Sequence, residues 1–294
     1  MNRRKFLVAG TVGLAGLSIA GRTLAENMYS PANDVVVDKV KLGNTGLTIS
    51  RIAMGTGSSG FNGSSKQTRM GMESFEKIAH HAYEKGITFY DMAESYGSMP
   101  FVASSIKSFP REKLTLLSKI WTYDEGDERV EAAPKFLDRF RKAANTDYFD
   151  IILMHCMTKG NWTNSRKSYI EGLSRAKEDG IVKAVGVSCH NFDAFVEAVD
   201  SPWVDVILAR TNPWGEIMDA PPEQIKSLLL RAIQNGKGVI GMKIFAEGRR
   251  VAEHEREESI RYAMTQKHVH GITLGFSSPE EIDDAVAKVM KYAR

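Results

Sequence analysis

Asp91, Lys119 and His155 lie at or next to the ends of three apolar runs, and Tyr96 follows Asp91 by five residues. These residue types suit the reduction of a carbonyl group, because hydride addition leaves an alkoxide that needs a proton donor within hydrogen-bond reach. A tyrosine can donate this proton if its pKa of about 10 moves toward neutrality. A lysine ammonium beside the phenol favours the phenolate, and a carboxylate keeps that lysine charged. A histidine can orient the substrate oxygen and share its developing charge.

Taken singly, each residue also has a structural interpretation. Asp91 could cap the following helix, Lys119 could be a surface charge at a strand end, and His155 could be a core histidine. The chemical interpretation requires that the fold bring all four side chains together. It therefore depends on the elements that carry them.

Short apolar runs alternate with longer amphipathic helical patterns from residue 51 onward. We expect eight strands, at residues 51–54, 87–91, 114–120, 148–155, 182–188, 204–210, 238–244 and 271–276. Nearly continuous apolar strands joined by helices indicate a parallel sheet that is covered on its outer face. Eight such units predict an α/β fold of the (β/α)8 TIM barrel class, in which catalytic groups lie at the carboxyl ends of the strands.

The alternative is a doubly wound sheet, which usually has fewer strands and a glycine-rich dinucleotide fingerprint before a helix. Here the glycine-rich segment 55–60 is not followed at once by a helical pattern, which favours the barrel. Before the barrel, two strand-like runs flank Asn44-Thr45-Gly46. This turn chemistry predicts an N-terminal β-hairpin.

The same segments resemble the aldo-keto reductase family. Residues 91–97 (Asp-Met-Ala-Glu-Ser-Tyr-Gly) are similar to its Asp-x-Ala-x-x-Tyr-Gly motif, Leu117-Ser118-Lys119 to its lysine strand, and residues 147–155 to its Asp-hydrophobic-His strand. Residues 42–47, 186–188 and 275–281 match as well, so the resemblance runs from about residue 38 to the C-terminus. It implies Tyr96 as general acid/base, Lys119 and Asp91 as groups that tune its pKa, and His155 as the residue that orients a small carbonyl or alcohol substrate.

The resemblance also implies NADP(H) or NAD(H) as cofactor and no metal. The positions that correspond to cofactor contacts are Gly55, Thr56, Ser188, Asn191, Met242, Lys243, Gly275, Ser277 and Glu281. The chain departs from the family where a glutamine is replaced by Leu208 and an aromatic ring by Met242. At the adenine end, residues 277–287 contain no Arg or Lys to hold a 2′-phosphate, although Lys243, Arg249 or Arg250 could supply that charge.

The N-terminus predicts an export signal over residues 1–25, which leaves 26–294 for the barrel. Arg3-Arg4 precede an apolar stretch of about 15 residues, shorter than the roughly 20 that span a bilayer as a helix. The segment resembles a twin-arginine (Tat) signal peptide, with cleavage after Ala25 or Ala20. This implies a periplasmic protein that meets the Tat translocase during export and has no stable membrane insertion after cleavage.

The formal charge of +3 comes from this segment. Its four bases leave 35 Lys and Arg against 36 Asp and Glu in the rest of the chain, which offers no electrostatic footprint for nucleic acid. Cys156 and Cys189 would lie in an oxidising compartment, where one disulfide between neighbouring strands and two free thiols are the alternatives. The pairs His80-His81 and His268/His270 lack a carboxylate cluster at the expected catalytic face, so we interpret them as structural or exposed.

These observations favour an NAD(P)H-dependent oxidoreductase that reduces aldehydes or ketones, or oxidises alcohols. The alternative is a non-catalytic barrel that serves as a binding or accessory module in the periplasm. The altered nicotinamide contacts support the alternative, whereas the complete set of four catalytic residue types argues against it.

Overall fold

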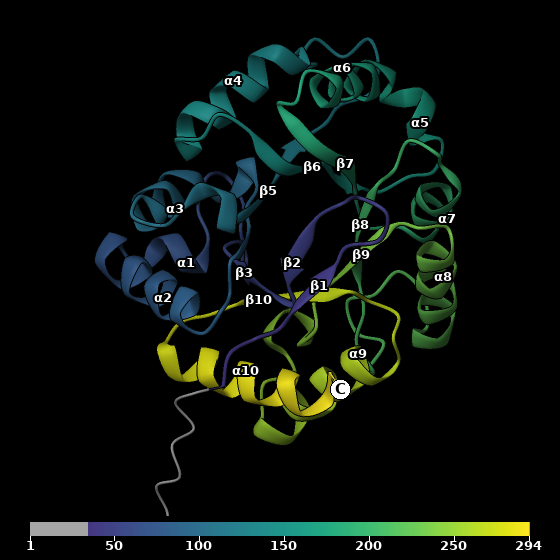
Figure 1. Cartoon of the computed structure of the whole chain (residues 1–294). Helices are drawn as coiled ribbons and strands as arrows, with labels where there is room; N and C mark the ends of the chain where they lie inside the picture. Colours follow the sequence, from purple (N-terminus) through teal and green to yellow (C-terminus); the bar gives the residue numbers. More distant parts are fainter. Residues whose placement is uncertain (1–34, 294) are drawn as a thin grey trace, which may run out of the picture. The chain divides into compact units, whose positions relative to one another are not determined.

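The computed structural model describes residues 35–293 (Figure 1). Within these residues, eight parallel strands close into a barrel in which each strand pairs with the next and β10 pairs back with β3. The barrel strands are β3 Ile52–Gly55, β4 Phe89–Asp91, β5 Thr115–Trp121, β6 Phe149–Met157, β7 Val182–Cys189, β8 Val206–Arg210, β9 Gly238–Met242 and β10 Gly271–Gly275. The predicted (β/α)8 barrel is confirmed.

Helices surround the barrel, and at least one lies in every connection between consecutive strands (Figure 1). They are α1 Lys66–Arg69, α2 Met72–Glu84, α3 Met99–Ile106, α4 Ala133–Ala144, α5 Trp162–Ser165, α6 Lys167–Glu178, α7 Phe192–Asp200, α8 Pro222–Gln234, α9 Glu253–Thr265 and α10 Pro279–Tyr292. Their apolar faces pack on the outward side chains of the strands and form the larger of two hydrophobic clusters. Among residues 35–293, none of the helices is both long and apolar enough to cross a bilayer.

The predicted hairpin is also present, as β1 Lys39–Lys41 paired antiparallel with β2 Thr48–Ser50. Its buried side chains Leu42 and Ile49 pack against the first residues of β9 and β10, Gly238 and Gly271. The hairpin therefore closes the barrel at the amino ends of the strands. This leaves the carboxyl ends as the accessible end of the barrel.

Inward-facing side chains alternate along each strand, as the period of two requires. The middle of the barrel is filled by an apolar layer that includes Phe89, Leu117, Leu153, Leu208 and Ile240. Two residues further along β4, β5 and β6, the inward face carries Asp91, Lys119 and His155. The barrel thus places these polar groups at its carboxyl end, next to the apolar layer.

The predicted signal peptide, residues 1–25, lies outside the described residues. The division of the chain into residues 1–25 and 26–294 therefore stays a prediction from the sequence.

Candidate active site

Tyr96 is the last residue of the 3-10 turn η2, Glu94–Tyr96, which follows β4. Gly97, in the left-handed conformation at φ +65°, ends this turn. The phenol ring packs on Gly57 and Gly60 of the segment after β3. The glycine-rich segment 55–60 therefore makes room for the tyrosine.

Lys119 is the centre of the polar cluster at the end of the barrel. Its ammonium, on a side chain that is 1% exposed, forms an ion pair with Asp91 and donates to the Met92 carbonyl at 2.8 Å. It also lies 3.5 Å from the hydroxyl of Tyr96, within the hydrogen-bond limit. The second carboxylate oxygen of Asp91 accepts from the Thr273 hydroxyl at 2.9 Å. The cluster thus joins β4, β5 and β10 beneath the tyrosine.

Burial and charge set the protonation states of the cluster. Burial by itself acts to lower the pKa of Lys119, but Asp91 and Tyr96 together raise it above its ordinary value, so the ammonium is retained. Burial raises the pKa of Tyr96, and Lys119 opposes this rise without reversing it. The pKa of Tyr96 therefore lies above its ordinary value. The phenol stays protonated at neutral pH.

His155 lies between two aromatic rings. Its imidazole makes edge contacts with Tyr96, at 5.6 Å between ring centroids, and with Trp121, at 5.7 Å. Burial and then the nearby Lys119 hold the pKa of His155 well below its usual value, so the ring is neutral. Its buried Nδ1 has no hydrogen-bond partner within residues 35–293. The ring thus faces the tyrosine as a neutral group.

A cavity of about 480 Å³ extends from Tyr96 and Asp91 to the start of α10. This volume lies in the range of ligand pockets, roughly 300–1,000 Å³. Five of the predicted cofactor-binding residues line it: Gly55, Met242, Lys243, Gly275 and Glu281. Because Tyr96 and residues at the start of α10 line the same cavity, it is a candidate site for a dinucleotide.

The other four predicted cofactor-binding residues do not line the cavity: Thr56, Ser188, Asn191 and Ser277. Thr56 donates its hydroxyl to the Asp91 carbonyl at 2.8 Å. The Ser188 hydroxyl accepts from the backbone of Cys156, and Asn191 caps the start of α7. These side chains support the walls of the site, and their contact with a cofactor stays a prediction.

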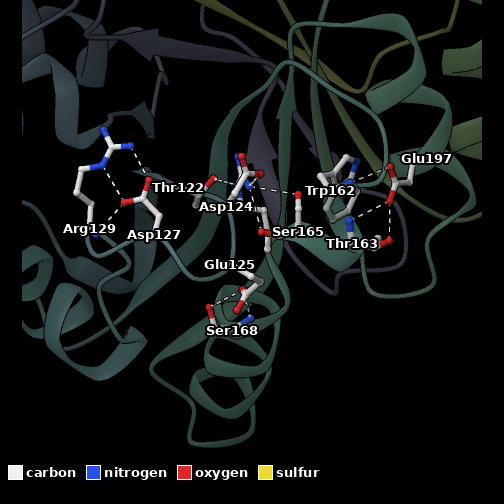
Figure 2. A network of polar contacts seen from close by, with 11 residues as sticks. Thr122, Asp124, Glu125, Asp127, Arg129, Trp162, Thr163, Ser165, Ser168 and Glu197 are labelled. Atoms are coloured by element: carbon white, nitrogen blue, oxygen red, sulfur yellow. Dashed lines mark hydrogen bonds and ion pairs between the residues drawn. The ribbon is translucent and has the colours of Figure 1, made fainter.

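Trp121 and the loop after β5 form one wall beside His155. Figure 2 shows the polar contacts that hold this loop to the segment after β6. Glu125 accepts from the backbone and the hydroxyl of Ser168, both at 2.8 Å, while Arg166 pairs with Asp124. A second cavity of about 290 Å³ opens on the side of Trp121, lined by Glu94, Ser95, Ile120, Trp121, Tyr123, Arg129, Glu131 and Tyr169. Trp214, which follows β8, donates its indole N–H to the hydroxyl of Ser259 at 3.0 Å.

Several residues of the site are not found by reasoning on the sequence alone. Thr273 reads as an ordinary barrel residue of β10, yet it holds the carboxylate of Asp91. Lys66 and Arg256 line the cavity from α1 and α9, and nothing in their local pattern marks them. The glycines of segment 55–60 are visible in the sequence, but their role in packing Tyr96 is not.

Cys156 and Cys189 are free thiols in the structure. Cys156 is half-buried in a left-handed conformation (φ +66°) next to His155, and Cys189 is fully buried. Burial raises the pKa of both thiols. The structure therefore has two free thiols and not a disulfide between Cys156 and Cys189.

The histidine pairs make structural contacts. His81 lies 2.9 Å from Asp283, and His80 lies 3.0 Å from the Ser105 carbonyl. His268 contacts the hydroxyl of Thr211 at 3.0 Å. Within residues 35–293, no group of three or more His, Cys, Asp or Glu side chains could hold a metal ion.

Comparison with known proteins agrees with this geometry. An L-galactose dehydrogenase of Arabidopsis thaliana is 24% identical over 285 residues, which cover 84% of this chain and 86% of that protein. A protein of Glycine max named probable aldo-keto reductase 1 is 27% identical over 161 residues, 52% of this chain and 45% of that protein. Among solved structures, an aldo-keto reductase of Bombyx mori in complex with NADP shares the fold, with a TM-score of 0.64, 17% identity and coverage of 88% of this chain and 92% of that one.

The family model described as Aldo/keto reductase family matches residues 51–291, from the residue before β3 to the last turn of α10. The match therefore spans the whole barrel, including the strands that carry Asp91, Lys119 and His155 and the turn that carries Tyr96. The chain belongs to the aldo/keto reductase family.

Proposed function

We propose that the protein is an NAD(P)(H)-dependent oxidoreductase that interconverts a carbonyl group and an alcohol, with Tyr96 as general acid/base. The observation that carries this proposal is the position of Tyr96: its hydroxyl lies 3.5 Å from the buried, charged Lys119, and its side chain lines a cavity of about 480 Å³. A binding module would have no need of a phenol beside a buried Lys–Asp pair.

Each residue of the cluster has a definite part in this chemistry. A bound nicotinamide cofactor supplies or accepts the hydride. In the reductive direction, Tyr96 gives its phenolic proton to the developing alkoxide. Lys119, kept charged by Asp91, stabilises the phenolate that remains. The neutral His155 donates a hydrogen bond to the substrate oxygen and orients it toward Tyr96.

The cofactor would lie along the cavity lined by Gly55, Met242, Lys243, Gly275 and Glu281. The buried thioether of Met242 would pack on a ring face where family members often place an aromatic side chain. The dehydrogenase relative and the NADP complex of the Bombyx mori protein support an oxidoreductase with a nicotinamide cofactor. The small-molecule substrate is a carbonyl or alcohol compound.

We further propose that the protein is exported to the periplasm by the Tat translocase. The support is Arg3-Arg4 ahead of the apolar stretch that ends at Ala20. This route carries folded proteins, so the cofactor can be bound before export and carried across. Retention then requires slow release: with an association rate of about 10⁶ M⁻¹s⁻¹, a nanomolar complex dissociates over roughly a quarter of an hour. We therefore expect nanomolar or tighter binding.

The test is the variant Tyr96→Phe, assayed with a panel of small aldehydes and by calorimetric titration with NADH and NADPH. The variant removes one hydroxyl from the cavity wall, so carbonyl reduction should be abolished while cofactor binding stays within about twofold. Turnover of a tenth of wild type or more would show that Tyr96 is not the acid. If the wild-type protein bound neither cofactor, the accessory-module alternative would replace the proposal.

A further inference from the structure

The part of the cavity at the start of α10 is acidic. Glu280, Glu281 and Asp284, all on the first two turns of α10, line it. Two amide groups at the start of this helix are engaged: Glu281 accepts from the backbone of Ser277 at 2.6 Å, and the Ser278 hydroxyl accepts from the backbone of Glu281. Such amides would otherwise be available to an anion at a helix start. This part of the cavity is therefore lined by carboxylates rather than by groups that bind an anion.

Arg256 also lines this part of the cavity, but its positive charge is neutralised by a carboxylate of the protein itself. Arg256 donates to Asp284 at 3.1 Å and to the Val251 carbonyl at 2.6 Å. Lys288, one turn after Asp284, pairs with the same carboxylate. The guanidinium of Arg256 thus already has hydrogen-bond partners within the protein.

Arg249 and Arg250, which the sequence suggested as positive charges for a 2′-phosphate, lie elsewhere. Arg250 does not line the cavity: it pairs with Glu216 and with Glu255, and its guanidinium lies 4.9 Å from the ring centroid of Trp214. Arg249 is exposed and is likewise absent from the lining. Neither residue supplies positive charge to this part of the cavity.

Two lysines also line the cavity. Lys66 begins α1, where its backbone bonds to Ser58, and Lys243 follows β9 and pairs with Glu247. Lys243 helps to lower the pKa of His155, so its ammonium lies on the side of Tyr96 and His155. Neither Lys66 nor Lys243 belongs to α10, whose first two turns carry the carboxylates.

We propose that the cavity selects NAD(H) over NADP(H), with Glu280 and Glu281 as the residues that discriminate. The two cofactors differ only at the adenosine ribose, where NADP(H) carries a 2′-phosphate. A carboxylate accepts hydrogen bonds from ribose hydroxyls, as an acidic residue does in many NAD-binding folds. The same carboxylates repel a phosphate monoester, which carries nearly two negative charges at neutral pH. This inference rests on the proposed function, because it assumes that the nicotinamide lies at Tyr96.

The test is calorimetric titration of the purified full-length protein with NADH and with NADPH. The wild type should bind NADH at least tenfold more tightly, and rising salt should narrow the difference because it screens the repulsion. The isosteric double variant Glu280→Gln/Glu281→Gln keeps hydrogen-bond acceptors but loses both charges, so it should bring the two affinities within about threefold. Glu281→Arg should favour NADPH. Glu178→Arg, the same charge change on an exposed residue of α6, should leave the wild-type ratio unchanged.

The outcomes separate the two proposals. If the wild type bound NADPH as tightly as NADH or more tightly, the selectivity inference would be wrong and the proposed function would stand. The inference would be equally wrong if the preference for NADH were present but unaffected in the glutamine variant. If neither cofactor bound, the proposed function itself would fail.

Discussion

The ring of Tyr96 occupies the space that a side chain at position 57 would need. A Cβ atom on Gly57 would lie 2.2 Å from ring carbon Cε2 of Tyr96, well inside the contact distance of real atoms. A Cβ atom on Gly60 would lie 2.5 Å from Cδ1 on the other edge of the same ring. These two glycines let the backbone close over the phenol and thereby direct its hydroxyl toward Lys119.

We predict that Gly57→Ala lowers the turnover number on the order of a hundredfold. The ring must move by about 1 Å to admit the methyl group, and a displacement of this size at a reacting group costs roughly this factor. The cost in unfolding free energy should be smaller, about 1–3 kcal/mol. Steady-state kinetics and urea denaturation measure the two effects. Gly160→Ala is the control, since its new Cβ would meet the nearest atom at an ordinary 3.4 Å. Unchanged turnover in Gly57→Ala would refute the positioning role.

We predict that Lys119→Met destabilises the protein by about 3–5 kcal/mol and abolishes turnover. The substitution leaves the buried carboxylate of Asp91 without its cation, and this penalty is typical of a broken buried pair. The double variant Asp91→Asn/Lys119→Met removes both charges, so it should recover most of the unfolding free energy and stay inactive. Recovery of activity in the double variant would contradict the role of the ammonium in tuning Tyr96.

We predict that stability falls as the pH drops below about 6.5, in part because of His268. This side chain is fully buried, and burial lowers its pKa to about 4. In the unfolded chain His268 therefore binds a proton near pH 6.5, whereas in the folded protein it binds one only near pH 4. Acidification below pH 6.5 thus favours the unfolded state, and the stability present above pH 6.5 is lost. Between pH 7 and pH 5 the loss from this residue is about 2 kcal/mol.

Urea denaturation at the two pH values measures this loss in the wild type and in His268→Gln. The variant should lose about 2 kcal/mol less than the wild type over the same interval. His254→Gln, on the exposed start of α9, is the matched control and should keep the full dependence. Equal dependence in all three proteins would show that His268 is not the group responsible.

We predict that Arg3→Lys/Arg4→Lys keeps the protein in the cytoplasm while a wild-type chain reaches the periplasm. The double substitution preserves charge and apolar length, so it changes only the paired guanidinium groups that define a twin-arginine signal. Fractionation of cells and immunoblotting of each compartment measure the distribution. Export of the lysine variant at the wild-type level would indicate another route and remove the argument for cofactor loading before export.

The sequence by itself determined the barrel and the four residues proposed for its chemistry. Strand and helix periods are local, so the eight apolar runs and the helices between them could be placed without knowing their partners. Alternation along a strand then required Asp91, Lys119 and His155 to share the inward face with Phe89, Leu117 and Leu153. Their place at the carboxyl ends followed from the fold class.

Only the tertiary structure decided which groups meet across the barrel. Thr273 reaches Asp91 because β10 closes the barrel against β3, a pairing between residues more than 180 positions apart along the chain. Whether a basic side chain is free to bind a ligand likewise depends on its neighbours. Arg256 lines the cavity but pairs with Asp284, and Arg250 pairs with Glu216 outside the cavity lining. Such contacts depend on register and packing between distant elements, and local periodicity carries no information about them.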